Sequence, residues 1–259
     1  MSNHTIWGMI HVPTIPGSGI QKKSFDEIKE FCLIDAKNLF DNGVKHFFIE
    51  NFGDAPFTKG SVQPHVTAGL TAIIEHIKSH LPGCIFGVNV LRNDALSALA
   101  IASTTGSQAI RVNVLTHARL TDQGIIEGCS YELTRYKHQL QSNLEIWADV
   151  DVKHSYSLAS IPLEDSIHDT LGRGGADKVI FTGSRTGVEA DFKIIKSLIE
   201  ANVLTPEQVA IGSGISPENI QDFMPYAKNF IVGTSLKQQG IFTNHIDPQK
   251  VSKLVSSIS

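Results

Sequence analysis

The sequence has few cysteines, and their arrangement excludes a disulfide framework or a typical zinc site. Its 259 residues contain only Cys32, Cys84 and Cys129, which are far apart and odd in number. None belongs to a C-x-x-C pair, the spacing expected of a zinc site or redox centre. We therefore expect three reduced thiols. Because secreted proteins more often pair their cysteines, we also expect a cytoplasmic location.

Long apolar runs and basic clusters are lacking as well. No run of 18 or more apolar residues occurs, so the sequence predicts no transmembrane helix. The N-terminal residues MSNHTIWGMI show no basic region followed by an apolar core, so no signal peptide is expected. The net charge is -4 without a lysine or arginine cluster. This indicates neither a nucleic-acid-binding patch nor a polybasic membrane patch.

Eight short apolar runs recur along the chain, with helical patterns between them. Alternation of strand and helix is typical of parallel βαβ units. Eight such units in about 250 residues predict an α/β fold, a single-domain (β/α)8 TIM barrel over residues 1–259. An open doubly wound sheet is the alternative, because a strand count does not determine closure. The expected strands are residues 5–10, 45–50, 84–90, 108–114, 144–152, 177–182, 208–212 and 229–233.

Helix-start signals lie between several of these runs. The segment SFDE at 24–27 has the pattern of a capping box, and an apolar stripe over 66–81 predicts a second helix. Asp94 is a good N-cap for the helix after the third strand. Ser216 and Pro217 are expected at the N-cap and first turn of a later helix.

Polar residues gather at the carboxyl ends of the predicted strands, where the active sites of TIM barrels lie. Because side chains alternate between the two faces of a strand, Asp149, Asp151 and Lys153 should point into the barrel. The same alternation directs Arg111 and Asn113 inward. The candidate catalytic residues are His11, Glu50, Asn89, Arg111, Asn113, Asp149, Asp151, Lys153 and His154.

Two interpretations of these charges remain open. A buried pair between Asp149 and Arg111 could serve structure alone, since buried charges must be paired. Glu50, Asp151 and Lys153 are expected nearer the mouth, and for them we favour a functional role.

Each candidate has a chemical role that its side chain can perform. Lys153 could act as a base, an electrostatic partner or an imine former. Glu50, Asp151 and His154 are candidates for general acid–base catalysis, although alternation directs His154 away from the axis unless the strand has ended. No cofactor is certain. Glu50 with Asp149 or Asp151 could hold Mg²⁺ through oxygen ligands, and the sequence does not distinguish this from a salt bridge.

Glycine-rich turns follow the last two predicted strands. The loops after strands seven and eight are the common phosphate site of TIM barrels, and a short helix after such a turn attracts anions. The sixth loop, 182–187, adds hydroxyl groups, glycines and Arg185. We therefore expect a phosphorylated small molecule, such as a sugar phosphate or nucleotide. Its predicted phosphate ligands are Gly183, Ser213, Gly214, Gly233 and Thr234.

Long sequence blocks resemble the signature blocks of the BtpA/SgcQ family. They are GMIHVPTIPGSG, IENFGDAPF, GVNVLRND, IRVNV, TDQGIIEG, ADVDVKHS, TGSRTG, GSGISPENI and IVGTSLKQQG, in order from residue 8 to residue 240. The resemblance implies a TIM barrel related to ribulose-phosphate-binding barrels. Cyanobacterial relatives are named for photosystem I biogenesis, and other relatives occur in organisms without photosynthesis.

Some positions depart from these patterns. His117 stands where the family pattern has glycine, and Thr14 where it has proline. The segment 151–153 is also similar to the start of the D-x-K-x-x-D motif of orotidine and hexulose phosphate enzymes. Tyr156 occupies the last position of that motif, which argues against decarboxylase chemistry.

Two classes of function follow. The first is an enzyme, a lyase, isomerase or hydrolase, that acts on a phosphorylated substrate. The alternative is a non-catalytic assembly or biogenesis factor that uses the same scaffold to bind protein partners. Homo-oligomerisation is common among soluble proteins of this kind, although no residue indicates an interface.

Overall fold

Eight parallel strands form a closed barrel in the computed structural model, which describes residues 4–20, 22–150, 154–183 and 191–258. All eight predicted strands are present, and closure excludes the open sheet. Over the described residues, most predicted strands extend one or two residues beyond the observed ends, whereas the first, 5–10, stops one residue before His11. In barrel order the strands are β1 (Thr5–His11), β11 (Asn229–Val232), β10 (Val209–Ile211), β9 (Lys178–Phe181), β7 (Glu145–Asp149), β4 (Ala109–Val112), β3 (Ile85–Asn89) and β2 (His46–Glu50).

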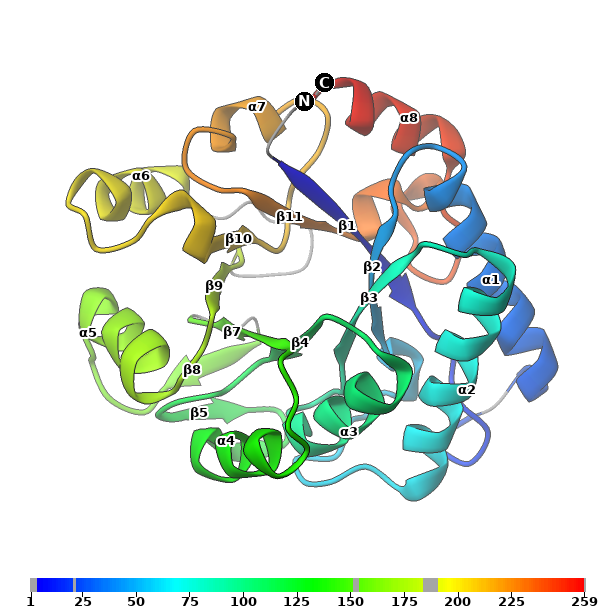
Figure 1. The fold of residues 1–259 in the computed structure, drawn as a ribbon, viewed down its shortest axis with the longest axis horizontal. Coiled ribbons are helices and arrows are strands. Elements are labelled where there is room, and N and C mark those ends of the chain that lie inside the picture. The colour runs from blue at the N-terminus through cyan, green and yellow to red at the C-terminus, as the bar shows by residue number, and fades with distance from the viewer. Residues whose placement is uncertain (1–3, 21, 151–153, 184–190, 259) are drawn as a thin grey trace.

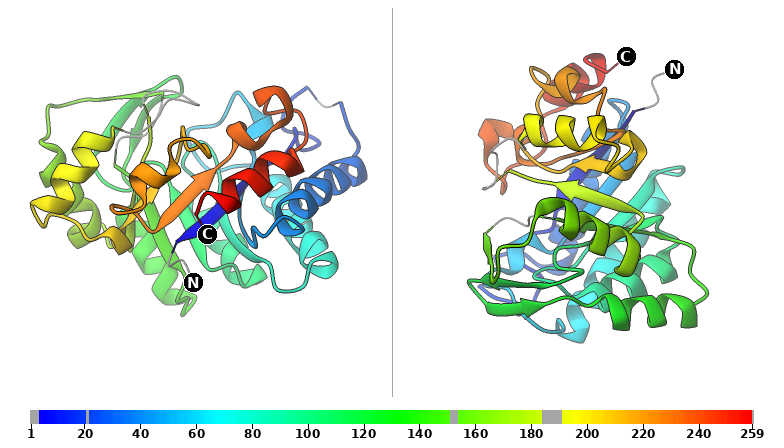
Figure 2. Two further views of the ribbon diagram at one scale, coloured as in Figure 1. Left: turned by 90° about the horizontal axis from the view of Figure 1, so that it is seen from above. Right: turned by 90° about the vertical axis from the view of Figure 1, so that its left-hand side faces the viewer.

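Helices surround the barrel, and α8 packs beside α1 to close the ring (Figures 1 and 2). The α-helices are α1 (Phe25–Phe40), α2 (Pro64–His80), α3 (Ala95–Thr105), α4 (Ser130–Gln139), α5 (Leu163–His168), α6 (Phe192–Glu200), α7 (Ile220–Phe223) and α8 (Pro248–Ser256). Short 3-10 turns are η1 (Phe52–Asp54), η3 (Pro206–Gln208), η4 (Thr234–Leu236) and η5 (Gln238–Gly240), and one π-turn follows α5, η2 (Asp169–Arg173).

Two of the three predicted helix starts are confirmed. Ser24 and Glu27 form the reciprocal capping box of α1, and the Asp94 carboxylate accepts the Ser97 amide at 3.1 Å to cap α3. The third prediction was wrong, because α7 begins at Ile220. The Asn219 side chain bridges the Ser216 amide and the Gly214 carbonyl, so it closes a separate turn before the helix.

The barrel interior is filled by aromatic and aliphatic side chains. Trp7 and Trp147 meet edge-to-face with ring centroids 5.0 Å apart, and Phe48 packs 5.3 Å from Trp147. Ile146 and Ala148 belong instead to the outer core between the strands and the helices. This alternation confirms the predicted facing of the fifth barrel strand.

A small antiparallel sheet, absent from the sequence prediction, lies in the loops after β4 and β7. Its strands are β5 (Ala118–Thr121), β6 (Gly124–Glu127) and β8 (Ser155–Ser157), in the order β6-β5-β8. Figure 1 shows β5 and β8 near α4 and α5. The sheet therefore joins two loops that are separate in the sequence.

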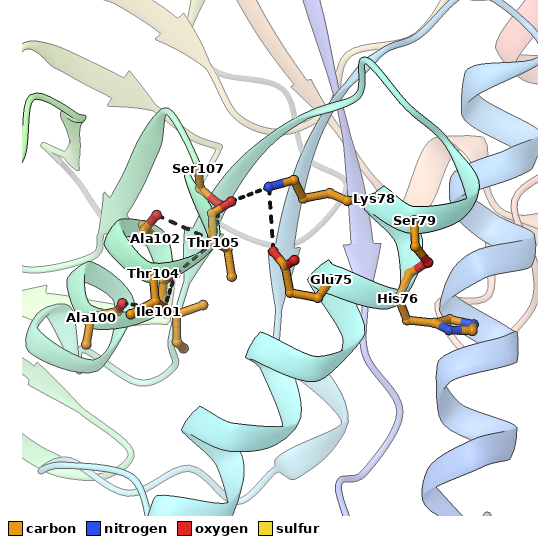
Figure 3. Close-up of polar contacts among 10 residues, drawn as sticks. All are labelled: Glu75, His76, Lys78, Ser79, Ala100, Ile101, Ala102, Thr104, Thr105 and Ser107. Atoms are coloured by element: carbon orange, nitrogen blue, oxygen red, sulfur yellow. Dashed lines mark hydrogen bonds and ion pairs between the residues drawn. The ribbon is translucent and has the colours of Figure 1, made fainter.

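A lysine links the ends of α2 and α3 (Figure 3). Lys78 donates to the carbonyl of Thr105 in the last turn of α3 and lies 3.5 Å from Glu75. A cation at a helix C-terminus interacts favourably with the helix dipole. Together with the adjacent left-handed Gly106, it satisfies the end of α3.

We predict that Gly87→Ala will destabilise the barrel. A Cβ at residue 87 would lie 2.4 Å from Cε1 of the fully buried Phe48, and such overpacking costs about 1–3 kcal/mol of unfolding free energy. Urea denaturation measures this change. Gly60→Ala is the control, because its Cβ would meet nothing within 4 Å. Equal stabilities of the two variants would contradict the packing argument.

Candidate functional site

Four buried polar side chains lie in one row across neighbouring strands. Strand register pairs His11 with Glu50, Glu50 with Asn89, and Asn89 with Arg111. All four are buried, and all line one pocket. The sequence predicted each of these residues at the end of its own strand, and barrel closure brings them together.

Glu50 lies at the centre of this row. Its Oε2 accepts a hydrogen bond from Asn89 Nδ2 at 2.9 Å, and its Oε1 is 3.5 Å from His11 Nε2. A carboxylate beside an imidazole is an arrangement that can exchange protons with a bound molecule.

Arg111 and Asp149 form a bidentate ion pair. Arg111 Nε and Nη2 donate to the two carboxylate oxygens at 2.9 and 2.8 Å, and Asn113 Nδ2 adds a third bond at 2.9 Å. Burial alone lowers the pKa of Arg111, but the charges of Asp149 and Glu50 outweigh it and hold that pKa above its ordinary value. Both oxygens of Asp149 are therefore engaged with protein donors, which favours the structural interpretation of this residue.

The magnesium hypothesis paired Glu50 with Asp149 or with Asp151, and of these two partners only Asp149 lies within the described residues. Within the described ranges, no three His, Cys, Asp or Glu side chains form a group that could hold a metal ion. A cation at Asp149 would have to displace Arg111 or Asn113. Asp151 and Lys153 lie outside the described residues, as does Arg185.

A pocket of about 1180 Å³ connects the polar row to the glycine-rich loops. Ser213, Gly214, Gly233 and Thr234 line it together with Glu50. Gly183 does not, and instead lines a second pocket of about 730 Å³ beside Asp149 and Asn113. His154 lines the first pocket from an exposed position beyond the end of β7, with a φ of 54°.

The glycines of these loops leave room that a side chain would fill. A Cβ on Gly233 would lie 3.0 Å from Cε1 of His11. Gly214 has a φ of +67°, a conformation that favours glycine. The Ser235 hydroxyl donates to the Ile215 carbonyl at 2.9 Å. This bond ties the loop after β11 to the loop after β10.

A buried ion pair anchors the loop after β11 to helix α1. Lys237 and Asp35 are both fully buried and contact each other directly. Asp35 also accepts the backbone amide of Ile246 at 2.9 Å and contacts the His245 ring at 3.0 Å. Asp35, a charged residue on the otherwise mostly apolar buried face of α1, is thus the partner of the loop lysine.

Several pocket residues were missed by the sequence reasoning. Arg92 lies on the loop between β3 and α3, and it is buried and lines the pocket. Burial lowers the pKa of Arg92 below its ordinary value, and the carboxylates of Asp149 and Asp122 oppose this effect. Phe52, Leu120 and Tyr156 also line the pocket.

The two departures from the family pattern have local structural correlates. His117 has a φ of 60°, a conformation that glycine adopts without strain, and its ring lies 3.4 Å from the Asp169 carboxylate. Thr14 donates its hydroxyl to the Gly53 carbonyl at 2.6 Å. Proline has no hydroxyl group and could not donate this hydrogen bond, which joins the loop after β1 to the loop after β2.

The closed parallel barrel with its surrounding helices defines the protein as a TIM barrel. Solved structures agree. A monomeric form generated from the dimeric phosphoribosylanthranilate isomerase of Thermotoga maritima has a TM-score of 0.56 at 13% identity, with 98% of each chain covered. The 3-keto-L-gulonate-6-phosphate decarboxylase from Vibrio cholerae has 0.54 at 15%, covering 100% of this chain and 98% of that one. At these identities the likeness shows the fold alone.

The chain belongs to the BtpA family, whose model matches residues 2–259. An uncharacterised protein from Methanocaldococcus jannaschii is 41% identical over 249 residues, which cover 96% of this chain and 93% of the relative. The photosystem I biogenesis protein BtpA of Synechocystis is 38% identical over 258 residues, covering 100% and 89%. The resemblance seen in the sequence blocks is therefore confirmed.

None of the helices in the described ranges has both the length and the apolar character needed to cross a membrane.

We predict that Arg111→Met will lower the free energy of unfolding by about 3–5 kcal/mol, because it leaves the buried Asp149 carboxylate without its cation. The change should be smaller when Arg111→Met is introduced into an Asp149→Asn background. Urea denaturation of the full double-mutant cycle measures the coupling.

The exposed pair Lys196–Glu200, 3.7 Å apart, supplies the control. Lys196→Met should change stability by no more than about 0.5 kcal/mol. Additive losses at Arg111 and Asp149 would show that the two residues act separately.

Proposed function

We propose that this protein is an enzyme that acts on a phosphorylated small molecule, such as a sugar phosphate or nucleotide. One observation carries the proposal: a single pocket joins the glycine-rich loops after β10 and β11 to a buried row of ionisable residues. The backbone N–H groups of the loops would bind the phosphate. The rest of the substrate would then lie over His11, Glu50 and Asn89.

Glu50 is the proposed proton-transfer group of the described site. It is buried, it accepts one hydrogen bond from Asn89, and its second oxygen faces His11. This geometry suits lyase or isomerase chemistry, in which a proton moves to or from the substrate. Asp151 and Lys153 stay predicted partners in this proton transfer. The role of Arg111 and Asn113 is to hold the Asp149 carboxylate in place.

Names of proteins with the same fold support a phosphorylated ligand. The solved barrels include phosphoribosylanthranilate isomerase and 3-keto-L-gulonate-6-phosphate decarboxylase. Each of these enzymes is named for a compound that carries a phosphate. A cytoplasmic location and a homo-oligomeric state stay predictions.

An assembly role is the second candidate, and one observation favours it. The Synechocystis relative, matched over the whole of this chain, is named for photosystem I biogenesis. A stoichiometric partner recovered with the tagged protein, together with a failure of every phosphorylated compound to bind, would establish this role in place of the enzymatic one.

We predict that a phosphorylated ligand at 100 times its dissociation constant will stabilise the fold by about 2.7 kcal/mol. For a chain of this size, that corresponds to a rise of about 5–10 °C in the melting temperature. The measurement is a thermal-shift screen of inorganic phosphate, sugar phosphates and nucleotides, with and without Mg²⁺.

Thr234 provides the matched variants for this screen. Thr234→Asp places a negative charge at the proposed phosphate position and should remove the shift, whereas the neutral Thr234→Asn should retain most of it. Melting temperatures without ligand check that both variants fold. An unchanged shift in Thr234→Asp would rule out phosphate binding at the loop after β11.

We predict that Glu50→Gln will reduce turnover by about 10²–10⁴-fold, because the amide keeps the shape of the side chain but cannot transfer a proton. The substrate is the compound with the largest thermal shift, and its affinity should stay close to that of the unmodified protein. Normal turnover in this variant would remove Glu50 from the chemistry.

A further inference from the structure

The small sheet presents a row of apolar side chains on its outer face. Register pairs Leu120 of β5 with Ile125 of β6 on one side and with Tyr156 of β8 on the other. Directly paired residues share one face of a sheet, so the three side chains form a row across all three strands. They are 44%, 48% and 76% exposed, respectively.

The opposite face of this sheet contacts the body of the protein. Ile126, next to Ile125 and therefore on the other face, is buried against Val114. Arg119 points to that same side and donates to the Ser155 hydroxyl at 2.9 Å. When one face of an antiparallel sheet is packed, the other is usually polar. An apolar row on the exposed face indicates that a ligand or another protein surface covers it in the functional state.

Two of the three side chains of the row lie at the large pocket. Leu120 and Tyr156 both line the large pocket that contains Glu50 and the glycine-rich loops. The apolar row is thus continuous with the site proposed for the substrate.

The pocket is also larger than a pentose phosphate requires. Its volume of about 1180 Å³ lies above the range of about 300–1,000 Å³ typical of small-molecule sites. Phe52 and Phe57, half-buried with ring centroids 6.5 Å apart, add aromatic surface to the same pocket. Aromatic side chains bind flat rings by stacking and edge-to-face contact, and tyrosine does so with little loss of conformational freedom.

We infer that the substrate carries a planar ring in addition to its phosphate, and that this ring packs on Leu120 and Tyr156 of the small sheet. The inference rests on the proposed function and narrows its substrate class to ring-bearing sugar phosphates, nucleotides or aryl phosphates. The phosphate loops anchor one end of the molecule, and the small sheet selects the other end.

Matched ligand pairs test the inference. Ribose 5-phosphate is compared with adenosine and uridine 5′-monophosphates, and methyl phosphate with phenyl phosphate, by titration calorimetry. In at least one pair, the member with the planar ring should bind tenfold or more tightly, a difference of about 1.4 kcal/mol. Tyr156→Ala should abolish this ratio and leave the affinity for the member without a planar ring unchanged.

Tyr131→Ala is the control, since Tyr131 is a comparably exposed tyrosine (62%) on α4 that does not line the pocket. Leu120→Ser supplies a second variant of the row and should act like Tyr156→Ala.

The outcomes separate this inference from the function on which it rests. If phosphates without a planar ring bind and a planar ring adds no affinity, or if Tyr156→Ala leaves the ratio intact, the ring site is wrong while the phosphate proposal stands. If no phosphorylated compound binds, both fail. If the protein is a dimer that Tyr156→Ala dissociates, the row is a subunit interface and the ring site is overturned.

Discussion

The ion pair between Arg111 and Asp149 is the interaction on which the polar interior of the mouth depends. Each charge would be costly to bury alone, and together they make a bidentate pair that also fixes Asn113. Arg111 then continues the row that leads through Asn89 to Glu50. The pair lies between the apolar side chains that fill the barrel and the pocket at its mouth. Because the two charges neutralise each other, charged residues can line the base of the pocket while the barrel interior stays packed.

The pocket combines two regions with different physical characters. Gly214 and Gly233 line the pocket without side chains, and the hydrogen bond from Ser235 to the Ile215 carbonyl joins the two loops. Around Glu50 and Arg111 the side chains are ionisable and held by one another. An arrangement of this kind binds one part of a molecule firmly and leaves another part beside groups that can move protons.

The sequence predicted the barrel well because each strand carries its own signal. Apolar runs, alternation along 145–149 and the capping box at Ser24 are local patterns, and each was confirmed. Alternation also anticipated the contact between Arg111 and Asp149. The sequence did not predict the row from His11 to Arg111, because the neighbours of a residue on adjacent strands depend on barrel closure and strand register. The small sheet was missed because its strands have only three or four residues, and because β8 pairs with β5 from more than thirty residues away. Arg92 was missed because a loop has no periodicity that predicts burial.

The burial of Lys237 has a consequence for chemical labelling. Its ammonium group is fully enclosed against Asp35, out of contact with solvent, while the backbone around it leads into Gly233 and Thr234. An amine-reactive reagent can reach this lysine only when the segment detaches from α1. The rate at which the reagent modifies Lys237 therefore measures how often the loop after β11 opens locally, and any molecule that binds to this loop should lower that rate.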